Sequence, residues 1–176
     1  MKSLTTTLSV AAFLLPAVRA INMAFYNPQC GVDYAFGPFY EELLAKAETP
    51  TSTSDFTDFF TANGSMVVMA NAAQGAEDIL ALRQALLPAD GSVRWNHFPN
   101  VTFVAEETDI TKTFQLSGIL HVVTAGNCST TYFSTRFAVT KNATTGIPNL
   151  QSRSGSLVTY DGFSVVSSPD PCFAPY

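Results

Sequence analysis

Four long β-rich runs in the second half of the chain place the strongest constraint on its fold. They are Val93 to Val104, Thr113 to Thr124, Cys128 to Lys141 and Asn149 to Tyr160. Three of them are rich in β-branched and aromatic residues, which favour strands. Gly126-Asn127 predicts a tight hairpin between the second and third runs, and residues 142–148 join the third to the fourth. The sequence therefore predicts four antiparallel strands.

The first half of the chain has helical periodicity. Apolar residues recur at helical spacing from Phe39 to Ala47, and Phe56, Phe59 and Phe60 line one face of a second, short helix. Ser52 and Asp55, three residues apart, resemble a capping box at its start.

A third helix is predicted from Gly75 to Leu87, where Pro88 ends it. Asn63-Gly64 predicts a turn, followed by a buried strand from Ser65 to Ala70. Helices gathered on one face of an antiparallel sheet give an α+β fold.

The first twenty residues are typical of a signal peptide. Lys2 supplies the positive charge, Leu8 to Leu15 form a short apolar run, and Val18-Arg19-Ala20 is a small-x-small cleavage pattern. The apolar run is too short to span a bilayer, and no later run is longer. We therefore expect a secreted, extracellular protein with no membrane segment in its mature form.

The chain divides into four regions. Residues 1–20 are the signal peptide, 21–33 an extended lead-in, 34–162 one α+β domain, and 163–176 a Pro-rich C-terminal tail. Cleavage would remove two of the nine basic residues and leave seven against fourteen acidic ones. An acidic chain repels phosphate backbones, so we expect no nucleic-acid partner.

Secretion has two further chemical consequences. Four N-glycosylation sequons begin at Asn63, Asn100, Asn127 and Asn142, and all but Asn100 fall in predicted turns. In an oxidising compartment the three cysteines permit one disulfide. We expect Cys172 to pair with either Cys30 or Cys128, because the Pro-rich tail needs an anchor.

Five segments, in this order and at this spacing, carry a resemblance to a known family. They are residues 56–64 (FTDFFTANG), 75–83 (GAEDILALR), 95–99 (WNHFP), 118–123 (GILHVV) and 136–139 (RFAV). Together they resemble the SnoaL-like branch of the nuclear transport factor 2-like superfamily, including secreted proteins of filamentous fungi. The resemblance implies a cone: a curved antiparallel sheet wrapped around about three N-terminal helices, often open to an apolar pocket.

The resemblance also implies a class of chemistry. Members of the superfamily include dehydratases, isomerases and polyketide cyclases that need no cofactor, and they use an acid–base pair in an apolar pocket. The only histidines are His97 and His121, on successive predicted strands, and Asp55 and Tyr40 are the other candidates. Scytalone dehydratase pairs two histidines with Asp and Tyr, but the flanking residues here do not match it, so no roles are transferred.

Apolar residues near these candidates are the predicted ligand contacts. Trp95 lies two positions before His97, so both side chains point to one face of a strand. Phe39, Phe56 and Phe60 are the other predicted contacts. A metal site needs a third convergent ligand, and the sequence shows none.

Three functions remain open at this point. The first is a secreted protein that binds a small apolar or aromatic molecule. The second is a cofactor-independent lyase or isomerase with His97 as its acid or base. The third is a secreted interaction protein whose own Phe side chains fill the cone. Apolar residues on both faces of the predicted sheet also predict a homodimer through the sheet.

Overall fold

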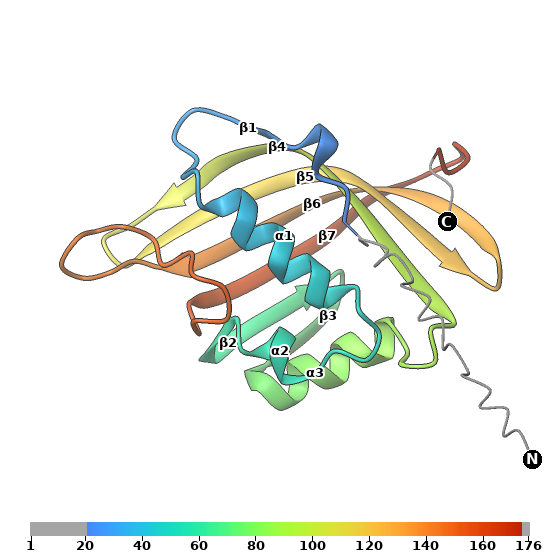
Figure 1. The fold of residues 1–176 in the computed structure, drawn as a ribbon, viewed down its shortest axis with the longest axis horizontal. Coiled ribbons are helices and arrows are strands. Elements are labelled where there is room, and N and C mark those ends of the chain that lie inside the picture. Colours follow the sequence, from blue (N-terminus) through green and yellow to red (C-terminus); the bar gives the residue numbers. More distant parts are fainter. Residues whose placement is uncertain (1–20, 174–176) are drawn as a thin grey trace, which may run out of the picture.

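The computed structural model describes residues 21–173, apart from the side chains of residues 163–165. The predicted signal peptide, residues 1–20, lies outside the described residues. After a 3₁₀ turn η1 (Met23–Phe25), the elements are β1 (Asn27–Pro28), α1 (Phe36–Ala47), α2 (Ser54–Thr57), β2 (Phe60–Val68), β3 (Asn71–Gln74), α3 (Gly75–Leu86), β4 (Val93–Glu107), β5 (Thr111–Thr124), β6 (Asn127–Thr140) and β7 (Leu157–Ser168). Figure 1 shows their arrangement.

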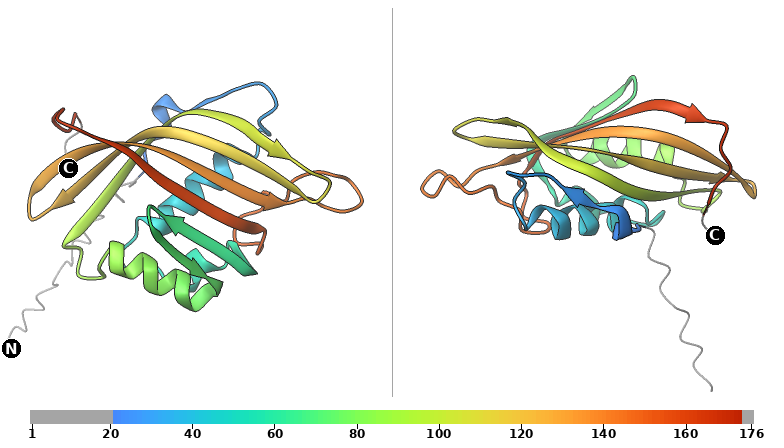
Figure 2. Two further views of the ribbon diagram at one scale, coloured as in Figure 1. Left: turned by 180° about the vertical axis from the view of Figure 1, so that it is seen from behind. Right: turned by 90° about the horizontal axis from the view of Figure 1, so that it is seen from above.

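One sheet of seven strands organises the molecule, in the order β1-β4-β5-β6-β7-β2-β3. Strands β4 to β7 form the predicted antiparallel series. At the two margins, β1 pairs with β4 and β2 pairs with β7 in parallel, so the sheet is mixed. The sheet is curved and strongly twisted, and α1 lies across one of its faces (Figure 2). The α+β cone expected from the resemblance is confirmed.

Aromatic packing joins α1 to the sheet. The ring of Phe36 stacks on that of Phe114 at 4.1 Å between centroids, and Tyr40 meets Phe137 edge-on at 5.3 Å. Phe39 meets Phe59 edge-on at 5.5 Å. Full burial of each such side chain contributes about 1.5–3 kcal/mol, so these contacts hold α1 on the sheet and on the turn that precedes β2.

The predicted turn at Asn63-Gly64 is wrong, because both residues lie inside β2. Gly64 is needed there for close packing: a Cβ would stand 2.9 Å from the Cβ of Phe60 and 3.0 Å from the carbonyl oxygen of Leu157. The pairing of β2 with β7 changes register at this point. Glycine therefore marks a bulge, and the strand turns later, at Met69.

The fourth antiparallel strand also differs from its predicted limits. Residues 149–156 form a loop, and β7 runs from Leu157 to Ser168, past the expected domain end at residue 162. Of the two disulfides expected for Cys172, the structure has the one with Cys128, while Cys30 is a free, exposed cysteine. No helix within residues 21–173 is long and apolar enough to cross a membrane.

Candidate acid–base site in the cone

The two histidines lie on opposite faces of the sheet. His97 on β4 is paired with Leu120 on β5, whereas His121 is paired with Asn96. Because side chains alternate along a strand, neighbours in this register point to opposite sides. We call the face of His97 and Phe114, which α1 covers, the inner face, and the face of Phe98 and His121 the outer face. The sequence placed both histidines near one site, and the structure separates them.

His97 is held by a carboxylate that the sequence analysis missed. Glu48, directly after α1, accepts hydrogen bonds from the backbone N–H of His97 at 2.9 Å and, through the same Oε1, contacts the ring nitrogen Nδ1. Both residues are buried, with Glu48 only 4% exposed. With Glu48 ionised, Nδ1 carries the proton, which leaves Nε2 as the basic nitrogen of the ring.

A buried arginine fixes the segment that carries Glu48. Arg83 on α3 donates from Nε to the carbonyl oxygen of Ala47 at 3.0 Å, and from its terminal nitrogens to those of Thr49, Pro50 and Ser52. These carbonyls lie at the C-terminus of α1 and just after it, where a cation is favourable. Arg83 is therefore a positioning residue, which connects α3 to the acid beside His97.

The electrostatics around Glu48 are those of a buried polar cluster. Burial raises the pKa of Glu48, and its contacts with His97 oppose that rise. Its second oxygen, Oε2, is buried and has no hydrogen-bond partner among the residues that the structure describes. Burial, together with the negative charge of Glu48, also raises the pKa of Tyr160.

A cavity of about 250 Å³ opens on the inner face beside His97. Apolar and aromatic side chains from the sheet and from α3 dominate its lining: Met66, Leu86, Trp95, Leu120, Phe133 and Tyr160. Trp95 stands edge-on to His97 at 6.4 Å between ring centroids, and Phe133 at 5.1 Å. Met69, with a positive φ of 55°, lies at the solvent-exposed side of the cavity.

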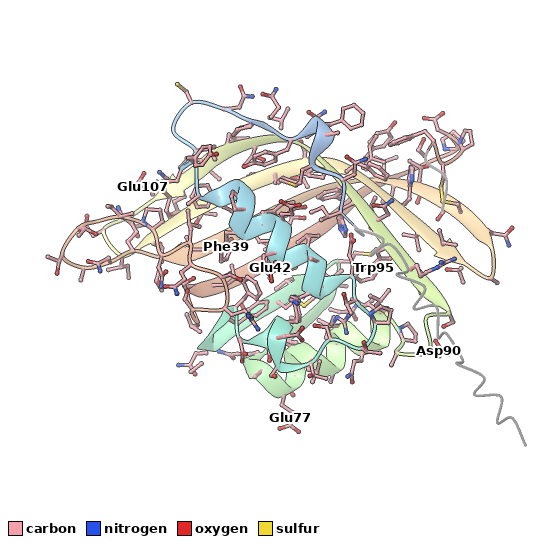
Figure 3. The ribbon with its side chains drawn as sticks, in the orientation of Figure 1. Phe39, Glu42, Glu77, Asp90, Trp95 and Glu107 are labelled. Atoms are coloured by element: carbon pink, nitrogen blue, oxygen red, sulfur yellow. A yellow bond between two sulfur atoms is a disulfide. The ribbon has the colours of Figure 1, made fainter. Side chains whose placement is uncertain are left out.

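Of the predicted ligand contacts, the structure places Trp95 in this cavity and puts the three phenylalanines elsewhere. Phe39, Phe56 and Phe60 are buried in the core, and none of them lines the cavity. Phe39 and Trp95 lie near opposite ends of α1 (Figure 3). Phe56 packs beneath Arg83, whose guanidinium carbon lies 5.9 Å from the ring centroid. The aromatic stripes of the helices therefore form core and not a pocket wall.

The remaining catalytic candidates lie outside the cavity. Asp55 accepts hydrogen bonds from the Ser52 hydroxyl at 2.6 Å and from the Thr53 N–H at 2.9 Å, which lower its pKa. It acts as a local cap, as the capping-box pattern suggests. Tyr40 is buried in the core, where burial raises its pKa well above the ordinary value, and it does not line the cavity.

The outer face carries His121 beneath the C-terminal tail. The ring of Phe173 packs on His121 and on Phe98, at 4.5 Å and 4.7 Å between centroids. A groove of about 650 Å³ beside this tail is lined by Phe25, Phe98, Asn100, Ile119, Tyr132 and Phe173. His121 lies within 4.8 Å of the sulfur atoms of Cys128 and Cys172, but those atoms are bonded to each other and are not thiolate ligands.

All four sequon asparagines are exposed. Asn127 begins β6 after the hairpin glycine, and Asn142 lies in the connection to β7. Asn63 lies inside β2, so its expected place in a turn is wrong. Asn100, on β4, stands at the outer groove.

Comparison with known proteins identifies the fold. No protein-family profile matches the sequence, and no curated protein matches it. Among solved structures, ActVI-ORFA from Streptomyces coelicolor superposes with a TM-score of 0.58 and 13% identity, over 74% of this chain and 94% of that one. A putative scytalone dehydratase from Novosphingobium aromaticivorans gives a TM-score of 0.57 and 8% identity, over 80% and 88%.

An orange carotenoid protein from Anabaena (Nostoc), with canthaxanthin bound, superposes at a TM-score of 0.54 and 12% identity. The match covers 84% of this chain and 40% of that protein. Together these structures confirm the SnoaL-like, nuclear transport factor 2-like fold that the sequence resemblance implied. At these identities the likeness shows the fold alone.

Proposed function

We propose that the chain binds a small apolar or aromatic molecule in the inner cavity and moves a proton on it, as a cofactor-independent lyase or isomerase. The observation that carries the proposal is the buried pair of Glu48 and His97 at the wall of an aromatic cavity. A carboxylate that fixes the tautomer of a histidine makes the other ring nitrogen a general base. His97 thereby accepts a proton through Nε2 and returns it to another position.

The cavity sets the size and polarity of the molecule. Its volume of about 250 Å³ lies just below the ~300–1,000 Å³ of pockets for drug-sized ligands. Trp95 and Phe133 supply flat aromatic surface, and Leu120 on the strand between them adds an aliphatic contact. A compact ring compound with one carbonyl or hydroxyl beside His97 fits this combination.

Proton exchange with solvent tests the proposal before any product is known. The protein is secreted from a filamentous fungal host and denatured, and the bound molecule is extracted and identified by mass spectrometry. Fresh protein is then incubated with that molecule in D₂O. We expect a gain of one mass unit at a carbon-bound position, because the base that removes the proton returns a deuteron.

Matched variants separate catalysis from binding. His97→Gln should abolish deuterium uptake while the molecule still binds, and His121→Gln, on the outer face, should leave uptake unchanged. Binding without uptake in the unaltered protein would reduce the function to storage or transport. Absence of any small molecule that binds the cavity would contradict the proposal and favour an interaction protein.

We also propose that the chain is secreted and N-glycosylated. The support is the signal-peptide pattern of residues 1–20 and the exposure of all four sequon asparagines. Treatment of the secreted protein with a glycosidase should increase its electrophoretic mobility. An unchanged mobility would contradict glycosylation.

A homodimer would pair through the outer face. Phe25, Tyr132 and Val166 are exposed there although they are large and apolar, and Tyr132 and Val166 are neighbours in the sheet. Light scattering on the enzymatically deglycosylated protein should give twice the chain mass. A monomer at tens of micromolar would exclude this pairing.

A further inference from the structure

The first described residues lie beside the acid–base pair. Ile21 is only 4% exposed and belongs to the main hydrophobic core. The backbone N–H of Asn22 donates to the carbonyl oxygen of His97 at 3.1 Å. The predicted cleavage site, Ala20–Ile21, therefore adjoins the strand position that carries the candidate base.

Hydrogen-bond register places Glu48 next to the nitrogen of Ile21. The lead-in runs parallel to β4, since Asn27 and Pro28 pair with Val101 and Thr102. In a parallel ladder, one residue makes two hydrogen bonds to the neighbouring strand. A residue whose carbonyl accepts from the N–H of Asn22 would donate its own N–H to the carbonyl two positions earlier, just before Ile21. Here the N–H of His97 donates instead to Oε1 of Glu48. The carboxylate thus accepts the hydrogen bond that a ladder carbonyl would accept, on the side of His97 toward the start of the lead-in.

The second oxygen of the Glu48 carboxylate can accept a further hydrogen bond. Oε2 of Glu48 is buried and has no hydrogen-bond partner among residues 21–173. A buried, unpaired carboxylate oxygen is costly, and a cation or N–H donor beside it removes that cost. The guanidinium of Arg83 does not supply it, because this group donates to the backbone carbonyls after α1.

We propose that cleavage after Ala20 completes the site, because the new α-ammonium group of Ile21 pairs with the carboxylate of Glu48. In the cleavage, a signal-peptidase-type protease adds water across the Ala20–Ile21 peptide bond. The C–N bond breaks, Ala20 keeps a carboxylate, and Ile21 gains a protonated amine. The ammonium donates to Oε2 while His97 retains Oε1. Processing thus fixes the ionised form of the acid that orients His97, and in this respect the inference rests on the proposed function.

Thermal stability of chains with different first residues tests the pairing. A fusion protease that leaves no extra residue yields one chain that begins at Ile21 and another that begins at Ala20. We expect the Ile21 chain to melt several degrees higher. In Glu48→Gln the difference between the two chains should vanish. In Glu42→Gln, which changes a partly exposed acid within α1, the difference should persist. Equal melting temperatures of the two unaltered chains would overturn the proposal.

Chemical labelling gives a second measurement that needs no substitution. Both chains are treated with an amine-acylating reagent at neutral pH, and labelling of the first residue is followed by mass spectrometry. A buried, paired ammonium should react at least tenfold more slowly at Ile21 than the α-amine of the Ala20 chain. Equal rates would refute the pairing. Because neither readout uses turnover, loss of deuterium uptake would contradict the proposed function and leave the pairing intact.

Discussion

Glu48 lies where a helix least favours an acid. The carbonyl groups at the C-terminus of α1 give that end a partial negative charge, which repels a carboxylate. Two residues later Pro50 excludes further helix, so the sequence shows an acid at a helix end. An acid in such a position is a signal of function, because a structural role would favour Lys or Arg. Helical periodicity does not single out Glu48, because periodicity selects apolar residues.

The raised pKa of Glu48 predicts a specific pH dependence of stability in the chain that begins at Ala20, where no ammonium pairs with the carboxylate. Because burial favours the protonated form in the folded state, the carboxyl group stabilises the fold below its ordinary pKa of 4.5. That contribution is lost as the pH rises through the raised folded pKa. Urea unfolding from pH 4 to 8 should therefore show this chain losing stability relative to its Glu48→Gln variant as the pH rises. If the difference in unfolding free energy between the two chains stayed constant with pH, the raised pKa of Glu48 would be contradicted.

Replacing Arg83 should lower the free energy of unfolding more than most other single substitutions. Arg83→Met keeps the volume but leaves the carbonyls of Ala47 and Ser52 without their buried donor. We expect a loss of about 3–5 kcal/mol in the free energy of unfolding, and a smaller loss for Arg83→Lys, which keeps the charge. Arg94→Gln, at an exposed position, should change it by less than about 0.5 kcal/mol. Similar urea midpoints for Arg83→Met and Arg94→Gln would refute the positioning role.

At the scale of elements, most strand and helix identities followed local pattern, whereas limits and pairing partners did not. The short second helix is the exception: it ends at Thr57, so Phe59 and Phe60, predicted on its face, lie in the following turn and in β2. The third helix and the first three β-rich runs lie where periodicity predicted them. Asn63-Gly64 has the composition of a turn, but contacts with Leu157, distant in sequence, determine its conformation. Parallel pairing of β2 with β7 joins residues about 95 positions apart, which no local signal encodes.

Gly118 allows β4 and β5 to approach at their irregular crossing. A Cβ at this position would overlap the carbonyl oxygen of Phe98 and stand 3.0 Å from the Cα of Pro99. Gly118→Ala should therefore cost about 1–3 kcal/mol of stability. Gly162→Ala is the matched control, since its Cβ would meet no atom closer than 3.5 Å. If thermal unfolding showed an equal loss of stability in both variants, a specific close approach of β4 and β5 at Gly118 would be contradicted.

For the whole molecule, the resemblance predicted the cone but not which residues face its cavity. His97 and Trp95 follow from strand alternation once the inner face is known. The separation of His97 from His121 depends on register, because a shift of one residue would bring the second histidine inside. The phenylalanines became core because Phe39, Phe56 and Phe60 pack in one buried cluster with the inner face of the sheet.

The disulfide holds the tail against the outer face. It closes a loop of 44 residues between Cys128 and Cys172, and its removal should cost about 2–4 kcal/mol. In the Cys128→Ser, Cys172→Ser double variant, a drop in melting temperature should accompany exposure of His121 to diethyl pyrocarbonate. Cys30→Ser, which removes an exposed free thiol, is the control. An unchanged melting temperature in the double variant would show that the tail adds no stability.

The two ends of the described chain are fastened at neighbouring residues of one strand. Asn22 bonds to His97, and Phe173 packs on Phe98. A stretching force applied between these ends would therefore act across the short distance between β4 and, through the Cys172–Cys128 disulfide, the start of β6. The lead-in would peel away first, one contact at a time, whereas the disulfide holds the tail. The molecule is thus mechanically compliant at its lead-in and stiff at its tail.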